Sequence, residues 1–130
     1  MAEASYPEGL LYHPAHDWAR VEGEAATFGI TWFAQDAVGE VVFFEPPAPG
    51  TAVVKDQPYA EIESVKAVSE VIAPLSGEVV EVNRAVETDP ETVNADPYGA
   101  GWMVQVRLTD LAEAGELLDA AAYRELVGGA

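Results

Sequence analysis

The sequence predicts a mainly β fold of the α+β class, with many short strands and small helices at their ends. Residues 17–22 and 102–108 each alternate apolar and polar side chains, as half-buried strands do. Glycines and prolines divide the chain into short segments. Its 130 residues are enough for one hydrophobic core, so we expect a single domain over 1–130. The core is expected over about 16–109 and C-terminal helices over about 110–127.

The N-terminal part predicts two paired strands after an irregular lead-in. Prolines and a glycine interrupt residues 1–14, so no regular structure is expected there. The strand over 17–22 is followed by a Gly-Glu pair at 23–24, which is typical of a tight turn. The chain then returns as a second strand over 25–30.

A short helix and a strand are expected next. Thr31 can cap a helix that runs through Ala37, and Gly39 can end it in the left-handed conformation. A strand over 39–45 follows, and the three prolines in 46–50 exclude regular structure there. The next expected elements are a short strand over 51–54 and a turn over 55–57.

The stretch from Pro58 to Pro74 contains Lys66, one of only two lysines in the protein, and its pattern leaves two structures open. Apolar residues at 62, 65, 68 and 72 would form the stripe of a helix. The density of β-branched residues and the bounding prolines instead favour two short strands that turn near Lys66. No Asn-Gly or Asp-Gly turn is present to decide between them.

The C-terminal part predicts a mixture of short elements. Asp89 is expected to cap a short helix that has Pro90 at its first position. Asp110 with Glu113 resembles a capping box for a helix over 111–117. The other expected elements are a strand over 77–83, a loop over 96–101, the strand over 102–108 and a helix over 120–127 that ends at Gly128-Gly129.

Composition and charge exclude several classes of function. Acidic residues number 23 against 6 basic ones, a net charge of −17, which opposes binding to nucleic acid and to anionic membranes. The same charge attracts protein partners with basic docking faces, and it also keeps a protein soluble. No apolar run is long enough to span a bilayer, and the first residues show no signal or transit peptide, so we expect a cytoplasmic protein.

The sequence shows no catalytic or metal-binding constellation. It has no cysteine and only two histidines, which excludes disulfides and argues against a zinc site. It also has no glycine-rich phosphate loop and no nucleophile elbow. The residues alone therefore give no support to a metal site or to a catalytic site.

The segment around Lys66 resembles the lipoyl-attachment hairpin of the glycine cleavage system H-protein family. The resemblance rests on Glu-Ser-Val-Lys-Ala at 63–67, followed by Ala-Pro-Leu-Ser-Gly-Glu-Val-Val-Glu-Val-Asn at 73–83. Valine and alanine flank the lysine, where biotin carriers typically have methionines. Outside the hairpin the resemblance extends from about His16 to Tyr123, through segments 16–18, 29–31, 34–35, 39–43, 93–94, 96–99 and 101–102. It implies a lipoyl-domain-like barrel-sandwich hybrid in which a β-hairpin carries the lysine.

A repeated tetrapeptide fits this resemblance. Gly-Glu-Val-Val occurs at 39–42 and again at 77–80, on either side of Lys66, and each copy is expected to open a strand. Lipoyl-type domains have two similar sheet halves, so such a repeat is what the resemblance implies.

The resemblance implies a carrier protein rather than an enzyme. Lipoic acid would be attached to Lys66 as N6-lipoyllysine, within an attachment motif formed by Glu63, Ser64, Val65 and Ala67. The arm would carry an aminomethyl group from glycine decarboxylase (the P protein) to aminomethyltransferase (the T protein). Dihydrolipoamide dehydrogenase (the L protein) would then reoxidise it, and a lipoate-attaching enzyme is the fourth implied partner.

Two alternatives to this cycle remain open. An H-like protein could act as a relay of lipoate or octanoate to other enzymes. In a different class, the chain could be an acidic β-sandwich interaction module with Lys66 unmodified and paired with Glu63 or Glu70.

The resemblance also implies a cleft in which the loaded arm docks. His16, Asp17 and Glu70 stand at the matching positions, and a carboxylate there could hold the amine end of the arm away from water. The competing interpretation is that His16 is structural, as most lone histidines are, and that the two acids are ordinary. The chain departs from the family pattern at Ala15, at Trp32 and in the turn over 55–57, which lacks the usual glycine.

Overall fold

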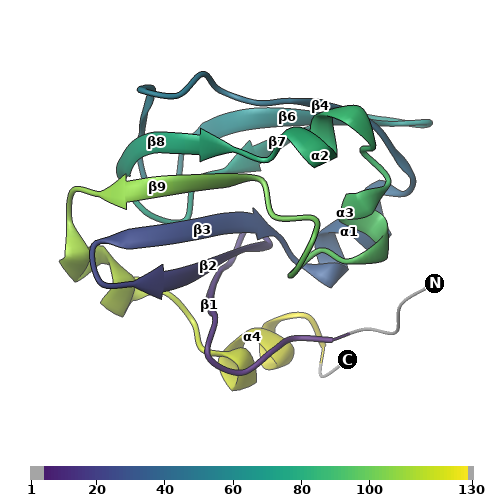
Figure 1. Ribbon diagram of the computed structural model, residues 1–130. Coiled ribbons are helices and arrows are strands. Elements are labelled where there is room, and N and C mark those ends of the chain that lie inside the picture. The colour runs from purple at the N-terminus through teal and green to yellow at the C-terminus, as the bar shows by residue number, and fades with distance from the viewer. Residues whose placement is uncertain (1–4, 129–130) are drawn as a thin grey trace.

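The computed structural model describes residues 5–128. Two sheets face one another, and small helices close their ends (Figure 1). The six-stranded sheet has the order β1-β2-β3-β9-β8-β5, with β1 Leu11–His13, β2 Asp17–Glu22, β3 Ala25–Ile30, β9 Val104–Leu108, β8 Gly77–Val82 and β5 Ala52–Val53. The three-stranded sheet has the order β4-β6-β7, with β4 Val41–Glu45, β6 Pro58–Ser64 and β7 Val68–Ile72. The predicted mainly β class with small helices is confirmed.

The N-terminal strands agree with the sequence except at their beginning. β2 and β3 pair antiparallel across the turn at 23–24, as predicted. The expectation that 1–14 is irregular is wrong for β1, which pairs with β2 through Tyr12 opposite Trp18. This strand has only three residues, so its alternation was too short to recognise, and backbone pairing with β2 fixes it.

Helix α1, Trp32–Val38, begins as predicted, because the side chain of Thr31 accepts a hydrogen bond from the amide of Ala34. The predicted conformation of Gly39 is wrong in part. Its φ of 92° is positive, but its ψ of −161° lies outside the left-handed helical region. β4 begins two residues after this glycine, whereas Gly77 opens β8, so only the second copy of the repeated tetrapeptide opens a strand at its glycine.

The stretch from 58 to 74 forms two strands, so its helical interpretation is wrong. β6 and β7 pair antiparallel with Glu63 opposite Val68, and the chain turns between them. Ser64 supplies the turn in place of Asn-Gly, because its hydroxyl oxygen accepts from the amides of Lys66 (3.2 Å) and Ala67 (3.1 Å). The amide of Ser64 also donates to the carbonyl of Ala67 at 2.8 Å.

The helices of the C-terminal half differ most from expectation. α2, Arg84–Thr88, was not predicted, and it begins where the side chain of Asn83 accepts from the amide of Ala85. The expected helix start at Asp89 and Pro90 is wrong, since Asp89 ends α2 and the next helix, α3, spans Thr92–Ala95.

The predicted capping box is also wrong. Asp110 caps a 3₁₀ helix, η1 (Leu111–Glu116), through the amide of Ala112. Glu113 instead accepts hydrogen bonds from the amide of Ser76 at 2.7 Å and from its hydroxyl at 2.9 Å, so this helix is tied to the start of β8. The last helix, α4 (Ala120–Leu126), lies where predicted and is followed by Gly128 at a φ of 98°. Gly129 lies outside the described residues.

Two hydrophobic clusters hold these elements together. The larger one fills the space between the sheets, and the smaller one is aromatic and joins the N-terminal segment to α4. At its centre Tyr123 stacks on Tyr12, with ring centroids 4.8 Å apart. In the described part of the chain, no helix is both long and apolar enough to cross a membrane.

Candidate functional site

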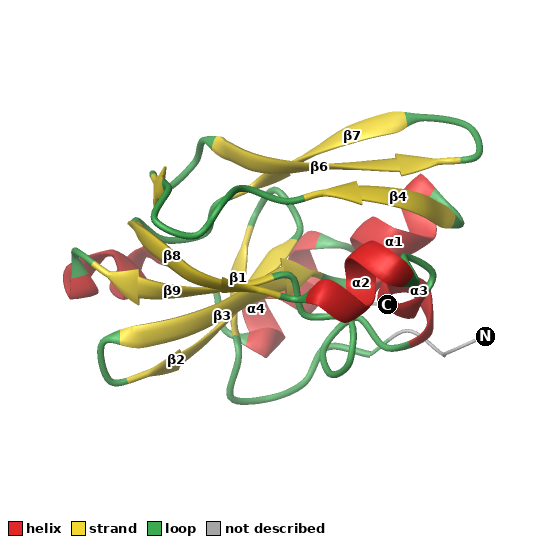
Figure 2. Cartoon of the chain, turned by 45° about the horizontal axis from the view of Figure 1, so that its top comes forward, coloured by secondary structure: helices red, strands yellow, loops and turns green. Residues whose placement is uncertain are grey.

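Lys66 lies at the exposed tip of the β6–β7 hairpin. The loop between these strands projects past the end of α1 in the turned view (Figure 2). The tip is held by the Ser64 hydroxyl and by a hydrogen bond from the amide of Val65 to the carbonyl of Glu40, at 3.3 Å. A well-defined turn therefore presents an exposed amine to other molecules.

The stem of the Lys66 side chain lies against the backbone at Gly39. A Cβ at Gly39 would come within 3.2 Å of Lys66 Cε and 3.7 Å of Nζ. Among residues 5–128, no carboxylate forms an ion pair with Lys66. The pairing with Glu63 or Glu70 that the alternative interpretation of Lys66 invoked is therefore not observed in this part of the chain.

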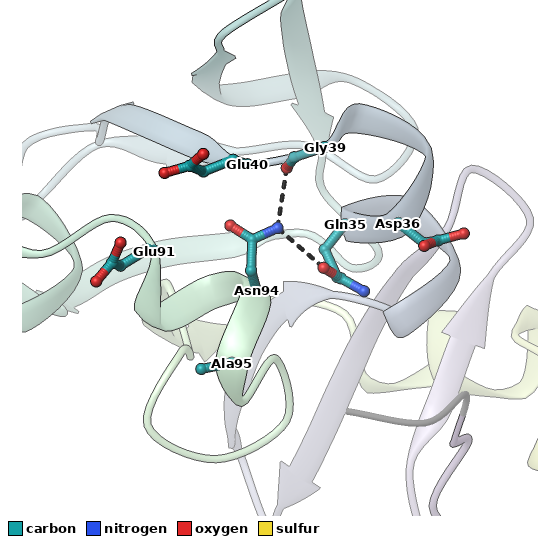
Figure 3. Close-up of a pocket in the computed structure, with 7 residues that line it drawn as sticks. All are labelled: Gln35, Asp36, Gly39, Glu40, Glu91, Asn94 and Ala95. Carbon is teal, nitrogen blue, oxygen red and sulfur yellow. Dashed lines mark hydrogen bonds between the residues drawn. The ribbon is translucent and has the colours of Figure 1, made fainter. Parts of the chain in front are cut away.

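A cavity of about 400 Å³ lies beside Gly39, between α1 and α3 (Figure 3). Asn94 lines this cavity, and its side-chain amide donates to Gln35 Oε1 and to the carbonyl of Gly39, both at 2.9 Å. The oxygen of the same side chain accepts from the amide of Val41 at 2.9 Å. Asn94 thus fixes the junction that carries Gly39. Apart from the place of Asn94 in the family pattern, no local signal indicated this role.

Asp17 is buried, with 2 % of its surface exposed, at the start of β2. Burial raises the pKa of Asp17 well above its ordinary value, and a backbone hydrogen bond from Ile72 opposes that rise. Its Oδ2 has no hydrogen-bond partner among the described residues. Burial also raises the pKa of Tyr59, and the Asp17 carboxylate raises it further. Asp17 is therefore an incompletely satisfied acid in the interior, near the free edge of β7.

His16 is held by contacts inside the protein. Its Nδ1 lies 2.7 Å from the hydroxyl of Tyr123, which lies 2.8 Å from Oγ1 of Thr31. Its ring packs on Phe33 with centroids 4.5 Å apart, and burial lowers the pKa of His16 below its ordinary value. These contacts favour the structural interpretation of His16, as a link between α4 and the start of α1.

Glu70 is separated from His16 and lies on the outer face of the three-stranded sheet. It is exposed and stands opposite Glu61 of β6. Its connection to Asp17 runs through β7, because Ile72, two residues along the strand, is the backbone partner of Asp17. The structure thus places Asp17, at the start of β2, beside β7, the strand that carries Glu70, and it does not bring the three predicted residues into one cluster.

The contact between His13 and Asp56 was not predicted from the sequence. His13 Nδ1 accepts from the amide of Ala15, so Nε2 carries the hydrogen that is donated to Asp56 Oδ1 at 2.5 Å. This contact is the main cause of a lowered pKa of Asp56. Asp56 occupies a φ of 75° in the turn that lacks the family glycine. Aspartate tolerates this conformation because its side chain is short and polar. The Asp56 carboxylate also accepts the hydrogen bond from His13.

Within residues 5–128, no three or more histidine, cysteine, aspartate or glutamate side chains are arranged so that they could hold a metal ion.

Comparison with known proteins gives concordant matches over nearly the whole chain. The family model described as "Glycine cleavage H-protein" matches residues 10–129. The glycine cleavage system H protein of Symbiobacterium thermophilum is 49% identical over 120 residues, which cover 92% of this chain and 94% of the relative. The protein of that name from Beutenbergia cavernae is 50% identical over 125 residues, 96% of this chain and 98% of the relative.

A solved structure agrees with this result. The crystal structure of a glycine cleavage system H protein from Mycobacterium marinum matches with a TM-score of 0.86 and 40% identity. The match covers 94% of this chain and 98% of that chain. Sequence and fold therefore point to the same family.

Proposed function

The chain belongs to the glycine cleavage H-protein family, and from that premise we propose that Lys66 is the residue on which it carries lipoic acid. Members of this family are carrier components of the glycine cleavage system and are not themselves catalysts. This chain is accordingly a lipoyl carrier of that system. Our proposal adds the attachment site, the residues that contact the arm and the partner enzymes.

The position of Lys66 is the observation that carries the proposal. Its amine is exposed at a turn, and the turn is fixed by Ser64 rather than by contacts of the lysine itself. The bare backbone of Gly39 leaves room for the lysine stem, since a Cβ there would lie 3.2 Å from Cε. Lys55 offers no comparable site, because its side chain is mostly buried and pairs with Asp56 and Glu116.

The chain's own part in attachment is to present Lys66 Nζ. As a neutral amine, Nζ would attack the activated carboxyl carbon of lipoate, and an amide bond would form as the activating group leaves and Nζ loses a proton. The positive charge of Lys66 disappears in this step. Glu63, Ser64, Val65 and Ala67 would act as the attachment motif by holding the tip in shape.

The attached lipoyl group would supply a disulfide, which is reduced when it takes up the aminomethyl group, and the dithiol left after transfer is what the dehydrogenase would reoxidise. Asp17 is the best-placed residue to receive the amine end of the loaded arm, because its buried Oδ2 lacks a partner. Glu70 lies further along β7, toward Lys66, and would flank the arm. His16 would support this region through Tyr123. The amine would bind the ionised form of Asp17 and so favour loss of its proton.

The partners follow from the system to which the family belongs. Glycine decarboxylase, aminomethyltransferase and dihydrolipoamide dehydrogenase would each act on the arm, after a lipoate-attaching enzyme has installed it. A cytoplasmic location stays a prediction.

Reconstitution with glycine decarboxylase tests the proposed function. The lipoylated chain should support exchange of glycine with carbon dioxide, and so should Lys55→Arg. Lys66→Arg, treated in the same way, should support none. Equal exchange with Lys66→Arg would reject Lys66 as the site, and no exchange with any of the three would reject the role itself.

A further inference from the structure

The outer face of the three-stranded sheet exposes apolar side chains close to Lys66. Among the described residues, four of the eight exposed large hydrophobic side chains gather here, a group we call the apolar patch: Val42, Phe43, Val65 and Val68. Glu63 of β6 stands opposite Phe43 of β4 on one side and opposite Val68 of β7 on the other. Side chains of residues that stand directly opposite one another point to the same face, so Phe43 and Val68 share one face of the sheet. A register shift between Val41 and Phe43 leaves both Val42 and Phe43 exposed, at 48% and 46%.

Three glutamates form a row across the same face. Glu45 stands opposite Glu61, and Glu61 stands opposite Glu70, so one residue from each of β4, β6 and β7 contributes. We call these residues the acidic row. Like charges directly opposite one another destabilise a sheet. The row also borders a hollow of about 330 Å³, whose other walls include Pro46, Thr51 and Pro58.

Nothing in the described part of the chain neutralises the acidic row. None of its three carboxylates takes part in an ion pair or a hydrogen bond there. The strands β4, β6 and β7 contain no lysine or arginine, and Lys66 at the tip is the nearest cation along the hairpin. The sheet therefore keeps an unfavourable arrangement that folding alone does not require.

We propose that the acidic row and the apolar patch form the surface by which the lipoate-attaching enzyme recognises this chain, through a basic enzyme face that surrounds an apolar depression. The inference rests on the proposed function of Lys66. An enzyme that meets Lys66 before attachment finds no arm to hold, so it must recognise the protein around the lysine. The apolar patch adjoins that lysine, and the acidic row lies behind it on the same sheet.

The charge of this face selects its partner. A second copy of the chain would bring one acidic row against another, and like charges would oppose that contact. A basic enzyme face would be attracted, and the attraction would mainly speed the encounter. The apolar patch would supply contacts that do not depend on salt, with Phe43 as the largest side chain.

The test measures initial rates of lipoylation of the unmodified chain by a lipoate ligase with ATP and lipoate. The triple variant Glu45→Gln, Glu61→Gln, Glu70→Gln is compared with Glu22→Gln, Glu24→Gln, Glu125→Gln, which removes the same charge from exposed positions elsewhere. We expect kcat/KM of the first variant to fall about tenfold at low salt, through KM, with kcat unchanged. The control should fall much less. The difference should shrink near 0.15 M salt, where the screening length is about 8 Å.

A second pair of variants tests the apolar patch. Val68→Ser is compared with Val80→Ser, which removes a similarly exposed strand valine from β8. We expect only Val68→Ser to lower kcat/KM, by about threefold to tenfold and with little dependence on salt. Circular dichroism of all variants checks that each is folded.

The outcomes separate the inference from the proposed function. If wild type is lipoylated and the acidic-row variant shows the KM of its control, the recognition surface lies elsewhere and the inference is wrong. A variant that is lipoylated normally but is a poor substrate for dihydrolipoamide dehydrogenase would assign the surface to another enzyme and would also overturn it. If wild type itself is not lipoylated, the proposed function fails.

Discussion

The side chain of Lys66 rests on the backbone of Gly39, so closely that a Cβ at Gly39 would lie 3.2 Å from Lys66 Cε. The two residues come from different parts of the chain, one at the end of α1 and the other at the tip of the β6–β7 hairpin. Asn94 of α3 holds the carbonyl of Gly39 at 2.9 Å, so three elements meet beneath the lysine. This junction sets the position from which an attached arm would begin.

Gly39→Ala should disturb both the backbone and the lysine. A side chain at a φ of 92° and a ψ of −161° costs about 1–3 kcal/mol, so the free energy of unfolding should fall by about that much. Gly50 has the same φ of 92° but nothing within 4 Å of an added Cβ. Gly50→Ala should therefore lose stability, measured by urea unfolding, without changing the lipoylation rate. The same lipoylation rate in both variants would contradict a role for Gly39 beneath Lys66.

Asp17 should make the fold less stable as the pH rises. Because burial raises its pKa in the folded chain, the folded state keeps this proton to a higher pH than the unfolded state. The stability that it contributes is complete below the unfolded pKa, near 3.9, and is lost as the pH rises toward the folded pKa. The free energy of unfolding of Asp17→Asn minus that of wild type should therefore increase from acidic to neutral pH. Urea unfolding at several pH values measures this, and a flat difference would show that Asp17 ionises freely.

Glu61→Gln should stabilise the isolated chain. Glu61 is the middle residue of the acidic row and faces a like charge on each side. Relief of both repulsions should raise the free energy of unfolding by about 0.2–1 kcal/mol for each pair, and added salt should reduce the gain. Glu22→Gln, at an exposed strand end, serves as the control. A loss of stability in Glu61→Gln would mean that the row is satisfied in a way that the cross-strand register does not reveal.

Tyr123→Phe should lower the stability of the fold without changing lipoylation of Lys66. The change removes the hydroxyl that bonds to His16 Nδ1 and to Thr31 Oγ1, at a cost of about 1–3 kcal/mol for the buried groups left unpaired. His16→Ala and the double variant complete a cycle, in which the two effects should not add. Lipoylation at Lys66 should be unchanged in all three. If His16→Ala alone lost lipoylation, His16 would have a role beyond structural support.

Much of the sheet architecture could be predicted, because alternation and turn residues are local signals. β2 and β3 have clear patterns, and their bounds were predicted at both ends. β1 could not be predicted in this way, since three residues carry too little pattern and the partner strand decides the outcome. Glu113 shows a similar limit: its spacing from Asp110 matches a capping box, but Ser76, distant in sequence, takes its carboxylate.

In the candidate site, too, local features could be predicted and contacts between distant residues could not. The hairpin around Lys66 followed from the family resemblance, whereas periodicity alone allowed a helix that the Ser64 turn excludes. Burial of Asp17 and the separation of Glu70 from His16 depend on how the two sheets pack, which no local pattern encodes. Asn94 was visible only as part of a segment that matches the family, and Gly39 only as a helix end and the start of the repeated tetrapeptide. The contact between them, and that of Gly39 with Lys66, depend on the fold.

Peptide mapping by mass spectrometry after treatment with a lipoate ligase, ATP and lipoate tests the central claim most directly. The peptide that contains Lys66 should gain the mass of one lipoyl group, in wild type and in Lys55→Arg alike. Lys66→Arg should gain none at any position. An unmodified Lys66 peptide in wild type, or a lipoyl group found on Lys55, would contradict the assignment.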